Sequence, residues 1–273
     1  MIHGFRFGIG LRVIKSAERF RTTVRRFAEL GYDVIHLPDH LGAPAPFPAL
    51  VAAADAAPTI RIGTYVLNSA FYSPALLARD ALAVDTLSGA RLELGLGTGY
   101  VRAEFEAAGI PYPSAGARVD HLARTSAYIK DHAPSLPLMI AGNGDRVLSV
   151  AAQYADIVGL GATVARSEHD DPLAERIAVL RAAAGGRFAE LELNLAITAV
   201  PTDSSGIPDL TMTRAYAPDA TDAQLLSMPS VLCGTPQDIA DKLGDMRERY
   251  GVTYFIVQDY HGEYFAEAMS LLR

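Results

Sequence analysis

The sequence predicts a single α/β domain in which eight parallel strands close into a TIM-like (β/α)8 barrel surrounded by helices. Three observations predict this fold. The chain of 273 residues has the size of one such barrel. Short, almost continuously apolar segments alternate with longer amphipathic ones, as expected for parallel strands covered by helices. No linker interrupts this alternation, so we expect residues 1–273 to form one domain rather than two.

The expected strands are short, apolar and rich in β-branched residues, and turn-forming or charged residues separate them from the helices. About eight strand–helix units favour a closed barrel over an open, doubly wound sheet. In chain order the predicted strands are residues 5–10, 33–37, 61–67, 91–96, 137–141, 156–160, 192–199 and 253–257.

The helix boundaries are indicated by residues that favour helix ends. Ser16 can cap the first helix, and Gly31 and Gly251 can end the helices that precede them. Pro74 and Pro236 stand where a first-turn proline is tolerated. The predicted helices are residues 17–30, 74–86, 146–154, 173–184 and 236–250, with a last helix from about Glu263.

Two segments interrupt the alternation of strands and helices. Residues 98–117 follow the fourth strand and are rich in glycine, proline and alanine, and residues 201–229 follow the seventh. Both insertion segments leave the carboxyl ends of strands, where the active sites of such barrels lie. We expect them to act as lids, with plain surface loops as the alternative.

Composition excludes several classes of protein. The net charge is −7 and no run rich in lysine or arginine occurs, so we expect no nucleic-acid partner. Apolar stretches are too short to span a bilayer, and we expect no membrane association. A lone cysteine, Cys233, cannot form an intrachain disulfide. These features favour a cytoplasmic protein that acts on a small-molecule substrate. They are compatible with assembly into a homodimer.

Two glycine clusters invite a nucleotide-binding interpretation. Gly95-Leu96-Gly97-Thr98-Gly99 is followed by Tyr100, and Gly142-Asn143-Gly144 is followed by Val147 at the third glycine position, so neither matches G-x-G-x-x-G. The segment 141–145 still follows an apolar strand and opens a helix, where free backbone N–H groups can bind a phosphate. A tight turn that only needs glycine is an equally good interpretation of this segment.

Asp39 and His40 stand at the carboxyl end of the second predicted strand. A histidine on this face can exchange protons near neutral pH, and its neighbouring carboxylate can orient it or accept from a cofactor ring. A histidine that merely caps a loop is the alternative. His36 and His40 have the i, i+4 spacing of some zinc sites, but Pro38 and the strand context spoil that geometry, so we predict no metal site.

Further segments, taken in order, resemble the luciferase-like monooxygenase superfamily, and most closely its branch of coenzyme F420-dependent oxidoreductases. The ordered set covers nearly the whole chain, which makes it specific although no single segment is decisive. The segments are residues 31–33 with 39–41, 61–67 with 73–79, 87–99 with 105–111, 137–144 with 151–156, and 234–239.

The resemblance implies a TIM-like barrel that binds either coenzyme F420 or flavin mononucleotide (FMN). It implies that Asp39 and His40 are catalytic, that His40 serves proton transfer, and that a non-proline cis peptide joins Tyr65 to Val66. One departure concerns Tyr100, which stands where sugar-phosphate dehydrogenases of this branch have a catalytic glutamate. The residues that the resemblance places around the cofactor are Asp39, Tyr65, Val66, Asn68, Thr98, Gly99, Ala141, Gly142, Asn143 and Gly144.

We therefore expect an oxidoreductase that transfers a hydride between coenzyme F420 and an organic substrate, with Tyr100 and Tyr260 contacting that substrate. Tyr260 is chosen because it follows the last strand. Two alternatives remain open. One is an FMN-dependent monooxygenase on the same scaffold, and the other is a non-catalytic protein that binds a flavin or deazaflavin.

Overall fold

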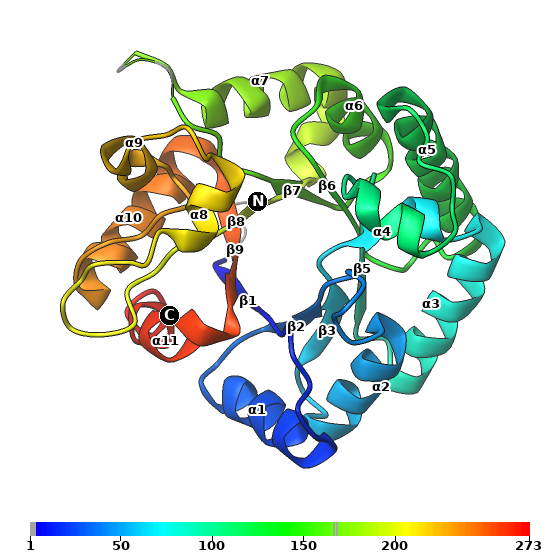
Figure 1. Ribbon diagram of the computed structural model, residues 1–273, viewed down its shortest axis with the longest axis horizontal. Coiled ribbons are helices and arrows are strands. Elements are labelled where there is room, and N and C mark those ends of the chain that lie inside the picture. The colour runs from blue at the N-terminus through cyan, green and yellow to red at the C-terminus, as the bar shows by residue number, and fades with distance from the viewer. Residues whose placement is uncertain (1–3, 166, 168) are drawn as a thin grey trace.

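The computed structural model describes residues 4–165, 167 and 169–273 and shows a closed parallel barrel with helices outside it (Figure 1). Strand order is β3-β2-β1-β9-β8-β7-β6-β5-β4, and pairing of β3 with β5 closes the ring. Because β3 and β4 together occupy one position, the barrel has eight strand positions, as predicted. The strands are β1 (Arg6–Gly10), β2 (Val34–Leu37), β3 (Arg61–Thr64), β4 (Leu67–Asn68), β5 (Leu92–Gly97), β6 (Leu138–Ala141), β7 (Ile157–Leu160), β8 (Glu192–Ala196) and β9 (Val252–Gln258).

Most helices begin and end at the residues that signal them in the sequence. Ser16 accepts a hydrogen bond from the N–H of Arg19, and Gly251 ends its helix with φ +73°. No helix of the described residues is long and apolar enough to cross a membrane. The helices of the barrel are α1 (Ala17–Glu29), α2 (Pro46–Ala56), α3 (Pro74–Ser88), α5 (Ala115–His132), α6 (Asp145–Tyr154), α7 (Pro172–Ala184), α10 (Pro236–Tyr250) and α11 (Gly262–Ser270).

Both insertion segments contain short helices. The segment after β5 contains α4 (Arg102–Ala107), and the one after β8 contains α8 (Thr211–Tyr216) and α9 (Asp222–Ser227). In Figure 1 these helices are seen at the near end of the barrel, α4 by β5 and α8 by β8. A small apolar cluster that includes Leu225 and Val231 packs α9 against the chain beyond β8.

The third strand position is interrupted between Thr64 and Leu67, where the Tyr65–Val66 peptide is cis, as the resemblance implied. The Thr64 hydroxyl bridges the break, because it donates to the carbonyl of Gly95 (2.9 Å) and accepts from the N–H of Gly95 (2.8 Å). Regular pairing resumes when Leu67 lies beside Leu96. The side chain of Thr64 thus replaces ladder hydrogen bonds that the interrupted backbone does not make.

The interior of the barrel is charged at the end where the strands begin. Arg6 pairs with both Glu93 and Glu192, and Arg61 donates to Glu93 at 2.7 Å. The Arg6 guanidinium also lies over the ring of Tyr254, 4.4 Å from its centroid. Further along the strands the interior becomes apolar, with Val34, Met139, Ile157, Tyr254 and Ile256 in one buried cluster. The barrel is therefore filled from its amino end, and open space remains only toward its carboxyl end.

Candidate active site

A cavity of about 530 Å³ opens at the carboxyl ends of the strands, a usual size for a site that holds a small organic ligand. Its lining comes from every strand position of the barrel and from α4 and α8, so both insertion segments border it. Of the residues predicted from the sequence to form the site, those that line the cavity are Asp39, His40, Tyr65, Val66, Asn68, Thr98, Gly99, Tyr100, Ala141, Gly142 and Asn143. Gly144 and Tyr260 lie outside this lining.

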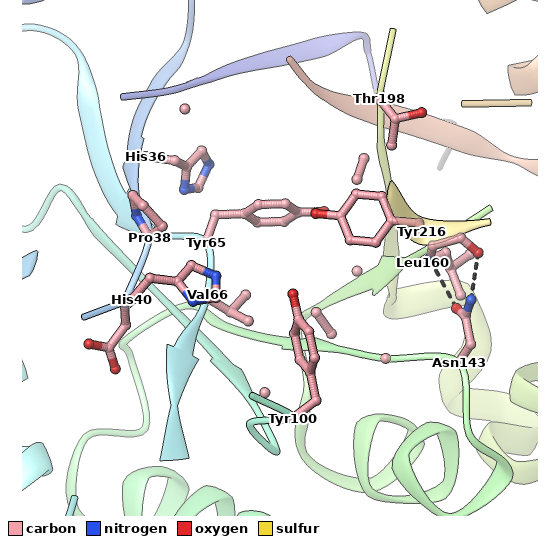
Figure 2. A pocket seen from close by; sticks show the side chains of 18 of the residues that line it. His36, Pro38, His40, Tyr65, Val66, Tyr100, Asn143, Leu160, Thr198 and Tyr216 are labelled. Carbon is pink, nitrogen blue, oxygen red and sulfur yellow. Dashed lines mark hydrogen bonds between the residues drawn. The ribbon is translucent and has the colours of Figure 1, made fainter. Parts of the chain in front are cut away.

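His40 reaches the cavity from the segment that follows β2 (Figure 2). Its Nδ1 lies 2.9 Å from Oε1 of Glu104 on α4, and both side chains are partly buried. Because a carboxylate can only accept, Nδ1 carries the hydrogen, and in the neutral ring Nε2 is then a proton acceptor. The Tyr100 ring stands edge-on to the imidazole with centroids 6.4 Å apart. The arrangement is that of a histidine oriented by a carboxylate.

Asp39 is held against the end of β4. Its Oδ2 accepts from the N–H of Asn68 at 3.0 Å. Burial raises the pKa of the Asp39 carboxyl, although the hydrogen bonds from Asn68 and Tyr72 and the proximity of His40 act in the opposite direction. Asp39 is therefore a partly desolvated acid beside His40, held at the cavity lining by Asn68 and Tyr72.

The glycines of the first cluster allow β5 to pass close to residues 64–68. A Cβ on Gly95 would lie 2.1 Å from the Thr64 carbonyl oxygen, and one on Gly97 would lie 2.9 Å from Val66. Gly99 has φ +69°, and its Cβ would overlap the amide of Asn68. These glycines serve backbone packing, and this explains why they do not follow a phosphate-binding pattern. They also leave Val66 exposed to the cavity as an apolar surface.

The second glycine cluster forms the turn from β6 into α6. The Asn143 amide donates to the Gly161 carbonyl (2.6 Å) and accepts from the Gly161 N–H (3.0 Å), so it ties this turn to the end of β7. No side chain caps α6 at Gly144. Asp145 in the first turn pairs with Arg176 at 2.5 Å. Backbone N–H groups of the α6 first turn thus remain for an anion next to the cavity.

His36 lies at the floor of the cavity and is fully buried. Its Nε2 is 2.6 Å from the Tyr254 hydroxyl, and its ring fits between Gly8 and Gly63, where any Cβ would come within 3 Å of it. Burial lowers the pKa of His36 to about 4. His36 is therefore a neutral side chain that supports the floor, where Figure 2 shows it beside Tyr65.

Acidification is expected to destabilise the fold through His36. Its pKa is about 4 in the folded protein and about 6.5 when unfolded, so the unfolded chain binds more protons between these values. Stability should be intact above pH 6.5 and fall as the pH drops toward 4, by about 3 kcal/mol from this residue. Burial also lowers the pKa of His261 to about 4, which adds to the effect. Melting temperatures between pH 7.5 and 4.5 measure the slope, which should be shallower in His36→Gln and unchanged in the exposed control His132→Gln. Equal slopes in wild type and His36→Gln would contradict the assignment.

Of the two tyrosines expected to contact the substrate, Tyr100 lines the cavity and Tyr260 does not. Tyr100 lines the mouth of the cavity and is 65% exposed, whereas the Tyr260 hydroxyl points to Met212 Sδ at 3.2 Å, outside the lining. Sequence reasoning missed four lining side chains that matter below: Glu104, Arg12, Tyr216 and Gln258. Gln258 directly follows the last predicted strand, and Arg12 stands two residues beyond the first one. Their places near strand ends were therefore a usable signal. Glu104 and Tyr216 lie inside the insertions and had none.

Comparison with known families gives a match to the luciferase-like monooxygenase family over residues 2–124. An uncharacterized protein of Sinorhizobium fredii, y4vJ, is 35% identical over 75 residues, which are 28% of this chain. That match spans only about a fifth (21%) of the relative's own length. The resemblance inferred from the sequence segments is therefore confirmed over residues 2–124.

Solved structures extend the likeness to the whole chain. The coenzyme F420-dependent tetrahydromethanopterin reductase of Methanopyrus kandleri superposes with a TM-score of 0.76 at 16% identity, covering 99% of this chain and 100% of that one. A riboflavin lyase solved with modified FMN gives 0.78 at 14% identity, covering 99% and 92%. Other structural neighbours are monooxygenases. The chain thus has the luciferase-like fold shared by F420-dependent reductases and monooxygenases, and its residues 2–124 show the sequence pattern of the luciferase-like monooxygenase family.

Proposed function

We propose that the protein is a coenzyme F420-dependent oxidoreductase that transfers a hydride between the deazaflavin and an organic substrate. The observation on which the proposal depends is the pair His40–Glu104, a carboxylate-oriented histidine that faces an otherwise largely apolar cavity. Such a histidine can give or take the proton that accompanies hydride transfer. The likeness to F420-dependent enzymes supports the choice of cofactor.

The residues present fit a flavin-type group. Val66 and the backbone at Thr98 and Gly99 offer an apolar, close-packed surface for a flat ring, and Asp39 and Asn68 offer polar atoms at its edge. The uncapped first turn of α6, after Gly142 and Asn143, would hold the phosphate through backbone N–H groups. Coenzyme F420, when bound, supplies two-electron hydride chemistry that reacts poorly with oxygen, because carbon replaces the ring nitrogen at position five.

The protein's own part is orientation, proton transfer and exclusion of water. Glu104 holds the Nδ1–H of His40, so that Nε2 can accept a proton from the substrate oxygen or, when protonated, return it. Asp39 fixes Asn68 and with it the end of β4 beside the ring position. Tyr100 and Tyr216, from the two insertions, cover the mouth and shield the reacting atoms from solvent.

Cofactor choice is tested by equilibrium fluorescence titration of the purified protein with coenzyme F420 and with FMN. We expect tighter binding of F420. The same deazaflavin without its phosphate tail should bind at least tenfold more weakly, because the α6 N–H groups then lose their partner. Tighter binding of FMN, together with oxygen consumption by the reduced complex, would replace this proposal with an FMN-dependent monooxygenase. Tight binding of F420 with no turnover against any acceptor would indicate a non-catalytic binding protein.

A further inference from the structure

The cavity has a second side that the proposed cofactor contacts leave free. Asp39, His40 and the two glycine clusters lie on β2 to β6, whereas the opposite side is formed at β1, β8, β9 and α8. Unlike the cofactor side, it combines long apolar or aromatic side chains with two polar side chains, Arg12 and Gln258. They include Arg12, Thr198, Met212, Tyr216, Met228 and Gln258.

Arg12 makes no close ion pair with a described residue. It stands two residues beyond β1, is exposed and lines the cavity. Among the described residues no carboxylate lies within 4.0 Å of its guanidinium, whereas Arg146 and Arg176, near the α6 turn, are paired with Asp120 and Asp145. Asp259 directly follows β9, and its Oδ1 accepts from the N–H of Tyr260. Burial raises the pKa of the Asp259 carboxyl, and the Arg12 guanidinium acts in the opposite direction from beyond ion-pair distance. The positive charge of Arg12 is thus available at the cavity mouth.

The position of Arg12 at the mouth is supported by its effect on two tyrosines. Burial raises the pKa of the Tyr100 hydroxyl, and the Arg12 guanidinium acts in the opposite direction. The same opposition holds at Tyr260. Arg12 is therefore close to both hydroxyls, on the side of the mouth where β9 ends.

Gln258 supplies a second unpartnered polar group. It is the last residue of β9 and lies beside Gly10 of β1, whose missing side chain makes room for it, since a Cβ there would be 3.2 Å from the amide. Its Oε1 is buried and accepts no hydrogen bond from a described residue. A buried acceptor without a donor is costly, so its presence in a cavity points to a ligand that donates a hydrogen bond to it.

Between these polar ends and α8 the surface suits an apolar or aromatic body. Met212 and Tyr216 extend from α8, and Met228 lies further along the same insertion. Figure 2 shows the Tyr216 ring beside Tyr65 and Thr198, with Tyr100 pointing toward the same space. Methionine and tyrosine together form an adaptable surface for a flat or aliphatic group.

We propose that this side of the cavity binds an organic acid that also carries a hydroxyl or amino group, with its carboxylate on Arg12, that donor on Oε1 of Gln258, and its apolar or aromatic body against Met212 and Tyr216. The proposal rests on the proposed function, because it names the substrate class of that same site. A guanidinium matches a carboxylate with two parallel hydrogen bonds, which makes arginine the natural residue for this task.

The test uses benzoate as the probe and benzamide as its neutral isostere, with binding followed by saturation-transfer NMR on the full chain, alone and saturated with F420. Benzoate should bind in both states and benzamide at least tenfold more weakly. Arg12→Gln should lower benzoate affinity about 10- to 100-fold through loss of the charge-assisted bonds, with F420 affinity unchanged within about twofold. Arg26→Gln, which removes an exposed arginine paired with Glu263, is the matched control and should bind benzoate like wild type.

Each other outcome has a distinct meaning. Equal binding of benzoate and benzamide, or no effect of Arg12→Gln, would overturn the carboxylate subsite. Displacement of benzoate by F420 would also overturn it, because the probe would then occupy the cofactor's anion site. Tighter, Arg12-dependent binding of phenyl phosphate would replace carboxylates by phosphate esters as the substrate class. Arg12-dependent benzoate binding in a protein that does not bind F420 would support the subsite and contradict the proposed cofactor alone.

Discussion

Replacement of His40 by alanine is expected to lower turnover by about 10² to 10⁴-fold, the usual range for loss of a general acid–base residue. The imidazole lies in the cavity with Nδ1 on Glu104, and alanine removes the Nε2 atom that would exchange a proton with a ligand there. Cofactor affinity should change only a few-fold, because the ring surface at Val66 and the α6 turn are untouched. Titration by cofactor fluorescence and steady-state assays with the oxidised or reduced cofactor separate the two effects.

Two companion variants make the result specific. Glu104→Gln keeps the size of the side chain but removes the carboxylate that orients the imidazole, so it should give a smaller loss of turnover than His40→Ala. In the double variant the two losses should not add, because Glu104 acts through His40. His132→Ala, at an exposed histidine on α5, should behave like wild type. Normal turnover in His40→Ala would remove His40 from proton transfer.

Glu93→Ala is expected to destabilise the fold by about 3–5 kcal/mol, the usual cost of breaking a buried ion pair by removing one partner. Glu93 is 2% exposed and pairs with both Arg6 and Arg61 inside the amino end of the barrel. Burial acts to lower the pKa of Arg6, but Glu93 and its other partners raise it overall. Without Glu93, Arg6 keeps Glu192 as a partner, whereas Arg61 loses the carboxylate that it pairs with.

The matched comparison is Glu263→Ala, which breaks an ion pair with Arg26 at the surface. Both of its side chains are more than half exposed, so this change should cost less than about 1 kcal/mol. Urea denaturation of both variants, followed by far-UV circular dichroism, gives the difference in midpoint. A similar midpoint for Glu93→Ala and Glu263→Ala would contradict this prediction, because it would mean that loss of the Glu93 carboxylate leaves no uncompensated charge on Arg6.

Features that depend on residues close together in the sequence were predicted well. The bounds of α10 agree with the prediction because Thr235 caps it, Pro236 fits its first turn and Gly251 ends it. Asp39 and His40 could be placed at the site because they directly follow an apolar strand, and strand ends meet at one face of a barrel. The orientation of the site therefore followed from local sequence alone.

Features that depend on distant partners were not predicted. Helix α2 is apolar on all sides and rich in alanine, so no polar face gives it a helical period. The seventh strand was expected to reach residue 199 but ends at Ala196, since the N–H of Thr198 bonds to Ser230 in the returning insertion. The pair His40–Glu104 joins residues 64 positions apart, and no short-range pattern indicates it.

The close packing of Gly95, Gly97 and Gly99 against residues 64–68 has a consequence for how this scaffold can change. One side of the cavity is built from backbone that leaves no volume for side chains, so almost any substitution there disturbs the barrel itself. The apolar part of the other side is supplied by α8 and its flanking loop, which follow β8 and form no part of the closed sheet. New substrate ranges should therefore arise by exchanging residues 201–229, while the cofactor side stays as it is.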